Sequence, residues 1–434
     1  MSILLVVITI AATKDAHAIP SFSRQTNLTC NACHTRHMPI LNGFGQAFKA
    51  SGYPIMGTQS TIDGEDFSIP SELNGSMRLQ ARYQKSNGAN TDIISGDTTN
   101  SGQLQVPDEI SLYFGGRIAD TVGYFFEGST TASTLVSGFK LPGAYYAENA
   151  IYSVIPFITD SLGASYGYEQ SSTGAVRNIR WAEHRREISA QQFIGTDTGA
   201  TGVAFVVQND HGYINFSRWA PAFMARKGSA QKLSSSYLRI AATPTISTRN
   251  GDWSIQSGAQ FWSGTNFAYD SLSAISGLVS VVTVATAYDL EVFGKIGNRA
   301  IGLYATWAKS PAGSATQPNI LNAGRADSGS GQIEPTLYRV NERKAWTVGA
   351  EYSVIPNALH IGAAYRSAST GGTPGINSII GFNPHDNAIT LTSVYSVAQN
   401  IEFHLNHSIY SGSLYDTPQV TGNRLTTLMF ETAW

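Results

Sequence analysis

From about residue 74 onward, large apolar residues alternate with small or polar ones. The runs at 346–354, 359–366 and 401–406 show the alternation most clearly, because every second residue in each run is apolar. A period of two is typical of a β-strand whose two faces meet different surroundings. A soluble sandwich would show the same alternation, so the pattern predicts strands but does not by itself choose between architectures.

The number and length of these segments help to choose between the architectures. We predict about 16 strands, near 74–86, 107–117, 121–132, 148–155, 161–170, 201–209, 211–219, 234–246, 252–263, 281–294, 298–309, 343–354, 358–368, 386–397, 400–410 and 424–434. Their lengths centre near the ~9 to 11 residues that a tilted strand needs to cross a bilayer.

The connections between the predicted strands alternate in kind. Short links, such as the one containing Asn250-Gly251, are followed by long loops rich in Gly, Ser, Thr and Asn, for example 87–106, 171–200, 310–342 and 369–385. Outer-membrane barrels alternate in this way, with short turns in the periplasm and long loops outside. We therefore expect an all-β membrane barrel of about 16 antiparallel strands, with both chain ends on the periplasmic side.

The composition agrees with a barrel in outer-membrane lipid. Charged residues make up 13% of the chain, and no later stretch approaches the ~18 apolar residues of a transmembrane helix. Without such a helix, only a closed barrel satisfies every backbone group in lipid. The net charge of -2 and a pI near 6.5 argue against a nucleic-acid partner. The final Phe430 to Trp434 run resembles the aromatic C-termini of exported barrels.

Ahead of the barrel we expect two short regions. Residues 1–18 have an apolar core and end in Ala16-His17-Ala18, a small-x-small cleavage signal, so they predict a signal peptide. Residues 19–73 predict a small, mainly α-helical segment, with Leu41, Phe44 and Phe48 at helical spacing. That apolar face would cover a porphyrin edge, or pack on its neighbours as an ordinary amphipathic helix. The barrel is then expected over 74–434.

The only two cysteines of the chain lie in this segment, in the run Cys30-Asn31-Ala32-Cys33-His34. Two thiols at this spacing add to the two vinyl groups of a haem, and the histidine that follows binds the iron from one face. The motif therefore predicts a segment of the monohaem c-type cytochrome kind, holding one haem c. A zinc site or a redox-active thiol pair is the alternative, although zinc would need two further soft ligands.

Other candidate residues are less well defined by the sequence. Met56 and His37 are candidates for the second axial ligand of the iron, and Met56 has enough chain before it to fold back. The third long loop contains arginines that would pair with haem propionates if it entered the lumen: Arg177, Arg180, Arg185 and Arg186. We expect this loop to be a solvated surface loop instead.

Three stretches of the N-terminal segment, 19–26, 30–34 and 39–53, resemble the fused monohaem cytochrome-porin family of outer-membrane iron oxidases. The resemblance implies an oxidoreductase of the bacterial outer membrane that takes electrons from extracellular ferrous iron. It also implies a periplasmic electron carrier, a cytochrome c or a copper protein, as acceptor. Within that family Cys30 and Cys33 attach the haem and His34 binds its iron.

Two other functions remain compatible with these residues. In the first, the chain is an electron conduit for another donor or acceptor, including one that works in reduction. Alternatively it is a passive porin whose haem-bearing plug only closes or senses.

Overall fold

The computed structural model describes residues 20–34, 40–65, 68–89, 100–129, 135–170, 173–182, 188–223, 232–249, 251–269, 278–314, 316–322, 341–371, 385–398, 400–416 and 422–434. The predicted signal peptide lies outside these residues.

The N-terminal segment consists of α1 (Pro20–Thr26), the 3-10 turn η2 (Cys30–Ala32), α2 (Gly43–Ala50) and a hairpin of β1 (Thr61–Asp63) and β2 (Ser68–Pro70). The first half of the wall comprises β3 (Gly75–Ser86), β4 (Gln103–Ala119), β5 (Val122–Ser129), β6 (Val136–Lys140), β7 (Gly143–Ala147), β8 (Ala150–Thr159), β9 (Ala200–Asn209) and β10 (Gly212–Ala220). The second half comprises β11 (Ser235–Ala242), β12 (Thr245–Thr248), β13 (Gly251–Ser263), β16 (Ala285–Ile296), β17 (Arg299–Ser310), β18 (Arg343–Ile355), β19 (Leu359–Thr370), β20 (Asn387–Ala398), β21 (Ile401–Ser411) and β22 (Arg424–Ala433).

Elements outside the wall lie in the long loops. The loop after β8 contains the 3-10 turns η3 (Ala164–Gly167) and η4 (Arg180–Ala182) and the helix α3 (Ala190–Ile194). The loop before β16 forms a separate hairpin of β14 (Thr265–Tyr269) and β15 (Leu278–Val282), and the 3-10 turns η5 (Ile320–Asn322) and η7 (Ser413–Tyr415) lie in later loops.

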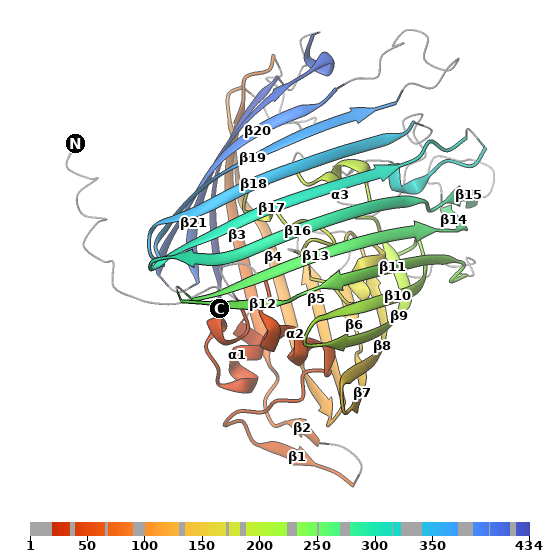
Figure 1. Ribbon diagram of the computed structural model, residues 1–434, viewed down its shortest axis with the longest axis vertical. Helices are drawn as coiled ribbons and strands as arrows, with labels where there is room; N and C mark the ends of the chain where they lie inside the picture. The colour runs from red at the N-terminus through yellow and green to blue at the C-terminus, as the bar shows by residue number, and fades with distance from the viewer. Residues whose placement is uncertain are drawn as a thin grey trace.

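The wall strands form a closed antiparallel ring, which β22 and β3 complete by pairing from Leu425↔Ser86 to Ala433↔Arg78. Eighteen wall elements make sixteen strands, because β6 and β7 are halves of one strand and β11 and β12 are halves of another. Pro142 and Pro244 lie at the two breaks, where a residue without an N–H interrupts the ladder. The predicted barrel of sixteen strands is confirmed (Figure 1).

The predicted number of strands is right, although two predicted positions differ. Residues 161–170 form no strand; they lie in the loop after β8, with η3 at the centre. Residues 136–147 form a strand that the sequence analysis did not predict, because Gly138, Pro142 and Gly143 break its alternation. Segment 161–170 alternates apolar residues because they pack against the inside of the barrel wall, and a local period of two does not distinguish this from a strand.

The two faces of the wall differ as the alternation predicts. Trp346 and Val348 are 40% and 43% exposed on the outside, whereas Thr347 between them is fully buried on the inside. Most other exposed large side chains of the wall are also apolar, including Leu290, Leu303, Ile361, Leu391, Phe403, Leu405 and Leu428. A continuous apolar band on a closed antiparallel barrel is a lipid-facing surface. The barrel is therefore an outer-membrane protein. No helix in the described part of the chain is long and apolar enough to cross a membrane.

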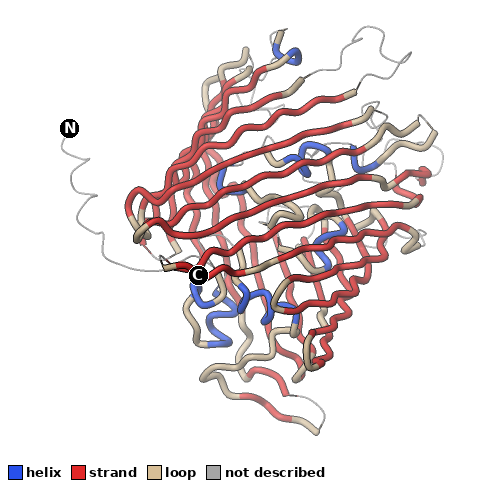
Figure 2. Tube along the Cα trace, in the orientation of Figure 1, coloured by secondary structure: helices blue, strands red, loops and turns tan. Residues whose placement is uncertain are grey.

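The described residues of the loop between β8 and β9, namely 160–170, 173–182 and 188–199, fold into the barrel, and we call this loop the lumen loop. Its described side chains are mostly buried, and Figure 2 shows its helical turns within the ring of strands. Wall side chains from three strands donate hydrogen bonds to its carbonyl oxygens: Lys140 Nζ to Glu169 (2.7 Å), Thr347 Oγ1 to Ile188 (2.7 Å) and Thr392 Oγ1 to Trp181 (3.1 Å). The prediction of a solvated surface loop is wrong, because wall donors satisfy its backbone inside the barrel.

The N-terminal segment closes the opposite end of the barrel. We call residues 20–57 the plug. The plug lies at the end where the short turns and the C-terminus gather, with the β1–β2 hairpin projecting beyond it (Figure 1). Inward-facing side chains of the wall hold it: Ser153 Oγ donates to the Ala50 carbonyl (2.7 Å) and Gln256 Nε2 donates to the Leu41 carbonyl (3.0 Å). Because short turns face the periplasm, the plug occupies the periplasmic mouth.

Candidate functional site

The start of α2 holds the Cys30–His34 motif in place. Asn42 caps the helix by accepting a hydrogen bond from the Gly45 N–H (2.9 Å), and its Nδ2 donates to the Ala32 carbonyl (2.9 Å). The Asn42 N–H also donates to the Cys33 carbonyl (2.9 Å). One residue therefore ties the helix to the turn between the two cysteines.

Gly45 brings α2 into close contact with that turn. A Cβ added at Gly45 would lie 2.4 Å from the Cys33 carbonyl oxygen, so only glycine fits without movement of one of the two segments. The predicted helix is confirmed, but the helix starts at Gly43, so Leu41 precedes it. Phe44 is exposed and Phe48 is buried, so the face toward the cysteines comprises Gly45, Phe48 and Lys49.

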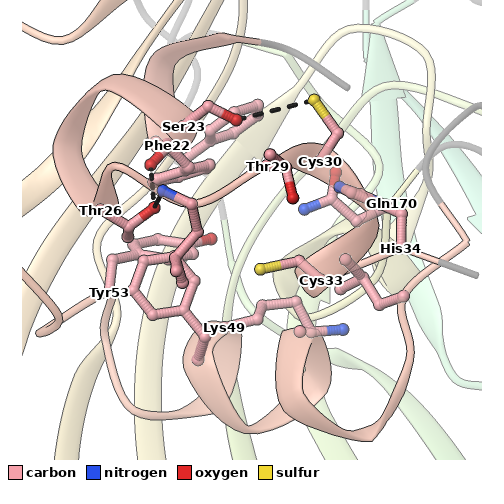
Figure 3. A pocket seen from close by; sticks show the side chains of 15 residues that line it. Phe22, Ser23, Thr26, Thr29, Cys30, Cys33, His34, Lys49, Tyr53 and Gln170 are labelled. Atoms are coloured by element: carbon pink, nitrogen blue, oxygen red, sulfur yellow. Dashed lines mark hydrogen bonds between the residues drawn. The ribbon is translucent and has the colours of Figure 1, made fainter. Parts of the chain in front are cut away.

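The motif lines a cavity inside the plug. The cavity opens to solvent, and Figure 3 shows the side chains around it. Its lining comes mainly from the plug, with one residue from β5 and one from the lumen loop: Phe22, Ser23, Thr26, Leu28, Thr29, Cys30, Cys33, His34, Leu41, Gly45, Phe48, Lys49, Tyr53, Phe125 and Gln170. Most of this lining is apolar or aromatic.

Aromatic side chains pack closely on one side of the cavity. The rings of Phe22 and Tyr53 stack with centroids 4.5 Å apart, and Phe48 meets each of them edge-on at 5.6 and 5.4 Å. Phe125 of β5 stacks on Phe22 at 6.1 Å. Such packing forms a preformed apolar wall beside the two thiols.

Both cysteines are free thiols. Cys30 is buried, and its Sγ lies 3.6 Å from the Ser23 hydroxyl. Cys33 is partly exposed; burial and the neighbouring Cys30 raise the pKa of its thiol above the usual value. Both sulfur atoms therefore remain available for covalent attachment to a group in the cavity.

His34 lies at the edge of the same cavity. Its Nδ1 is buried and has no hydrogen-bond partner among the described residues, while the ring interacts with the Ile40 backbone. Burial lowers the pKa of this imidazole to about 4, so the ring is neutral at ordinary pH. A neutral imidazole is the form that binds a metal.

Lys49 is among the residues that line the cavity, and it carries a buried ammonium group. Its side chain is 4% exposed, and its Nζ has no hydrogen-bond partner in the described part of the chain. The nearest carboxylate is Glu169 of the lumen loop, at 3.9 Å, and the ammonium also lies 3.7 Å from the centre of the Tyr168 ring. Burial lowers the pKa of Lys49 to about 8, and Glu169 opposes that shift. The amine is therefore mainly protonated at pH 7.

The structure brings together three of the residues predicted from the sequence, namely Cys30, Cys33 and His34. Met56 is not among the described residues that line the cavity, because Gln25 holds the backbone on both sides of it: Gln25 Nε2 donates to the Ile55 carbonyl (2.9 Å), and the Gly57 N–H donates to the Gln25 carbonyl (2.8 Å). His37 lies outside the described residues.

Of the four loop arginines, the structure describes the side chain of Arg177 alone. Arg177 is not among the described lining residues, Arg180 is placed only by its backbone in η4, and Arg185 and Arg186 lie outside the described residues. The cavity lining does include Lys49 and Gln170, and the sequence analysis missed both. A lysine directly after Phe48, on an otherwise apolar helix face, was the only available signal.

The residues at this site fit a covalently attached haem. Two free thiols, a buried imidazole nitrogen without a hydrogen-bond partner and an aromatic wall lie around one cavity. For the zinc alternative, the described residues contain no group of three or more His, Cys, Asp or Glu side chains placed to hold a metal ion.

No family model and no curated protein matches this sequence. Among solved structures, the chain resembles OmpF of Salmonella typhi in complex with daunomycin, at 10% identity and a TM-score of 0.51, over 86% of this chain and 100% of that one. OmpT of Vibrio cholerae matches at 12% identity and a TM-score of 0.45 (86% and 100% covered), and the channel DcaP of Acinetobacter baumannii at 12% and 0.48 (84% and 97%). The likeness to OmpF supports a porin-like barrel fold for this chain.

Proposed function

We propose that this protein is an outer-membrane electron conduit that carries one haem c in its plug, oxidises ferrous iron from outside the cell and passes electrons to a periplasmic carrier. One observation carries the proposal: the Cys30–His34 motif lines a largely apolar cavity in the periplasmic mouth of a membrane barrel. A porin needs no such motif for diffusion. The finer points, iron as donor and a cytochrome c or copper protein as acceptor, come from the family resemblance of the N-terminal segment.

The residues of the plug have separate tasks in this proposal. Cys30 and Cys33 would hold the haem through thioether bonds, and His34 would bind its iron from one face. When bound, the haem supplies a one-electron iron couple. Phe22, Phe48 and Tyr53 would shield one side of a bound haem from water, which favours a higher reduction potential than an exposed site would have.

The net reaction is balanced by a carrier outside the barrel. Each ferrous ion loses one electron and becomes ferric, and an oxidised periplasmic carrier takes up that electron. The cavity lies at the periplasmic mouth, whereas the apolar band of such barrels is about 25 Å tall. Ferrous iron must therefore enter the lumen from outside before its electron can reach the plug over a short distance.

The test uses membranes that contain the protein. Haem staining after denaturing electrophoresis should show a covalent haem on this chain. Addition of ferrous iron under anaerobic conditions should then produce the spectrum of reduced haem c. Absence of reduction at every physiological pH, in a protein that carries haem, would reject iron as donor and leave a conduit for another donor or acceptor.

A passive porin with a haem-bearing plug is the second candidate, and the OmpF-like fold favours it. Liposome swelling distinguishes the two functions. Rapid entry of small sugars into liposomes containing the intact protein would support the porin, whereas swelling close to that of protein-free liposomes would support the conduit.

A further inference from the structure

Lys49 carries a buried ammonium group, and the haem-attachment motif assigns this group no role. Lys49 lines the cavity, is 4% exposed and makes no hydrogen bond through Nζ within the described residues. A buried ammonium without hydrogen bonds is costly, and a ligand carboxylate would supply acceptors for its three hydrogens.

Glu169 does not supply a hydrogen-bond acceptor to the Lys49 ammonium. It is 3.9 Å from Lys49 Nζ, beyond hydrogen-bond range. Its Oε1 accepts a hydrogen bond from the Tyr213 hydroxyl and lies 3.6 Å from Arg239 Nε. Its Oε2, the oxygen that faces Lys49, has no hydrogen-bond partner among the described residues. Glu169 therefore balances the charge of Lys49 without satisfying its donors.

Lys49 lies on α2 beyond the point where the helix contacts Cys33. Thioether bonds would keep the vinyl edge at Cys30 and Cys33, and the propionate carboxylates occupy the opposite edge of the macrocycle. Gly45 contacts Cys33, and Lys49 follows four residues later, about 6 Å further along the helix axis. The lysine thus lies on the cavity-lining face of α2, one turn beyond the cysteines.

We propose that Lys49 binds a propionate carboxylate of the attached haem, with Glu169 of the lumen loop orienting the lysine. The proposal rests on the haem attachment proposed above. It gives the lumen loop a role at the site, because Glu169 links that loop to the charged edge of the cofactor. The sequence analysis considered the loop arginines for the same role, and that prediction stays untested.

The test compares three variants of the full-length protein in its haem-bearing form. Lys49→Met removes the charge and keeps the length of the side chain. Lys49→Arg keeps the charge. Lys140→Met is the matched control, because Lys140 is also buried near Glu169, but its Nζ already donates to the Glu169 carbonyl at 2.7 Å and it does not line the cavity.

The main readout is the redox-induced infrared difference spectrum of protein whose haem carries ¹³C-labelled propionate carboxyls. Lys49→Met should shift the labelled carboxylate band, whereas Lys49→Arg and Lys140→Met should leave it close to its wild-type position. Lys49→Met should also raise the ferric-to-ferrous ratio at a fixed ambient potential about tenfold, which is a fall of ~59 mV for a one-electron couple. The direction follows because a nearby positive charge disfavours the ferric form.

Three results would overturn the inference: a labelled band unmoved by Lys49→Met, a band moved equally by Lys140→Met, or loss of haem from both Lys49 variants. Loss of haem from Lys49→Met alone, with Lys49→Arg intact, would support a need for the cation. If the wild-type protein carries no covalent haem, the proposed function fails rather than the assignment of Lys49.

Discussion

At the scale of single residues, the motif depends on neighbours that keep it open toward the cavity. Asn42 hydrogen-bonds to the backbone on both sides of the turn, and Gly45 allows α2 to approach Cys33. The thiols and the imidazole are the reactive groups. Asn42 and Gly45 fix the backbone that carries them.

Removal of both thiols should abolish haem attachment. The Cys30→Ala/Cys33→Ala variant has no cysteine left, so no haem should remain on the chain after denaturation. Cys33→Ala alone should leave at most one thioether bond, which the pyridine haemochrome spectrum distinguishes from two. Haem staining of the double variant at wild-type strength would contradict covalent attachment at this motif.

Gly45 should tolerate no side chain. In Gly45→Ala the new methyl group meets the Cys33 carbonyl oxygen, and overpacking of this kind costs about 1 to 3 kcal/mol. We expect less haem per barrel, measured as haem absorbance relative to protein.

Gly43→Ala is the matched control for that change, because it lies on the same helix and its added Cβ meets nothing within 4 Å. It should keep the wild-type haem content. Equal losses in the two variants would mean that the contact with Cys33 is not the cause.

At the scale of elements, the lumen loop is held by buried charges as well as by hydrogen bonds to its backbone. Arg239 of β11 binds Asp289 of β16 with two hydrogen bonds, at 2.7 and 2.9 Å, and its Nε lies 2.9 Å from the Tyr213 hydroxyl. The same arginine lies 3.6 Å from Glu169 of the lumen loop. These contacts join the loop to three wall strands.

Loss of Arg239 should therefore destabilise the barrel interior. Arg239→Met leaves Asp289 without its paired cation and removes one of the cations near Glu169, and breaking a buried pair typically costs about 3 to 5 kcal/mol. We expect unfolding at a lower temperature, measured by the mobility difference between folded and heated protein on a gel.

A second substitution tests the cause. In Arg239→Met/Asp289→Leu one unpaired carboxylate is gone, so part of the lost stability should return. A double variant no more stable than Arg239→Met would contradict the charge explanation.

At the scale of the whole molecule, the plug and the lumen loop occupy the barrel from its two ends. They meet at the contact between Lys49 and Glu169, and each is also tied to the wall. A porin-like wall is thus combined with an interior that is largely filled by its own chain.

The intact protein should consequently pass sugars slowly in a liposome-swelling assay. Deleting residues 164–195 of the lumen loop together with the plug, residues 20–57, should raise the swelling rate several-fold. Folding of the variant is checked by its heat-dependent gel mobility. An intact protein as permeable as an open porin would contradict the filled lumen.

The sequence by itself determined the class of the molecule. Period-two alternation reports which residues face lipid and which face inward, and the order of short turns and long loops indicates a barrel with both ends at the periplasm. The motif at Cys30–His34 is likewise a local signal, and haem attachment to it stays a prediction. The boundary between the N-terminal segment and the barrel is also close to prediction, since β3 starts at Gly75.

Tertiary structure decided what enters the lumen. Residues 161–170 alternate like a strand but pack inside the barrel, and the strand at 136–147 is interrupted by Pro142, so local periodicity gave the wrong position in both cases. The placement of Lys49 at the cavity, and of Met56 away from its described lining, depends on contacts between segments far apart in sequence. These contacts form only when the plug and the lumen loop pack inside the closed barrel. A pattern within one short stretch of sequence does not predict them.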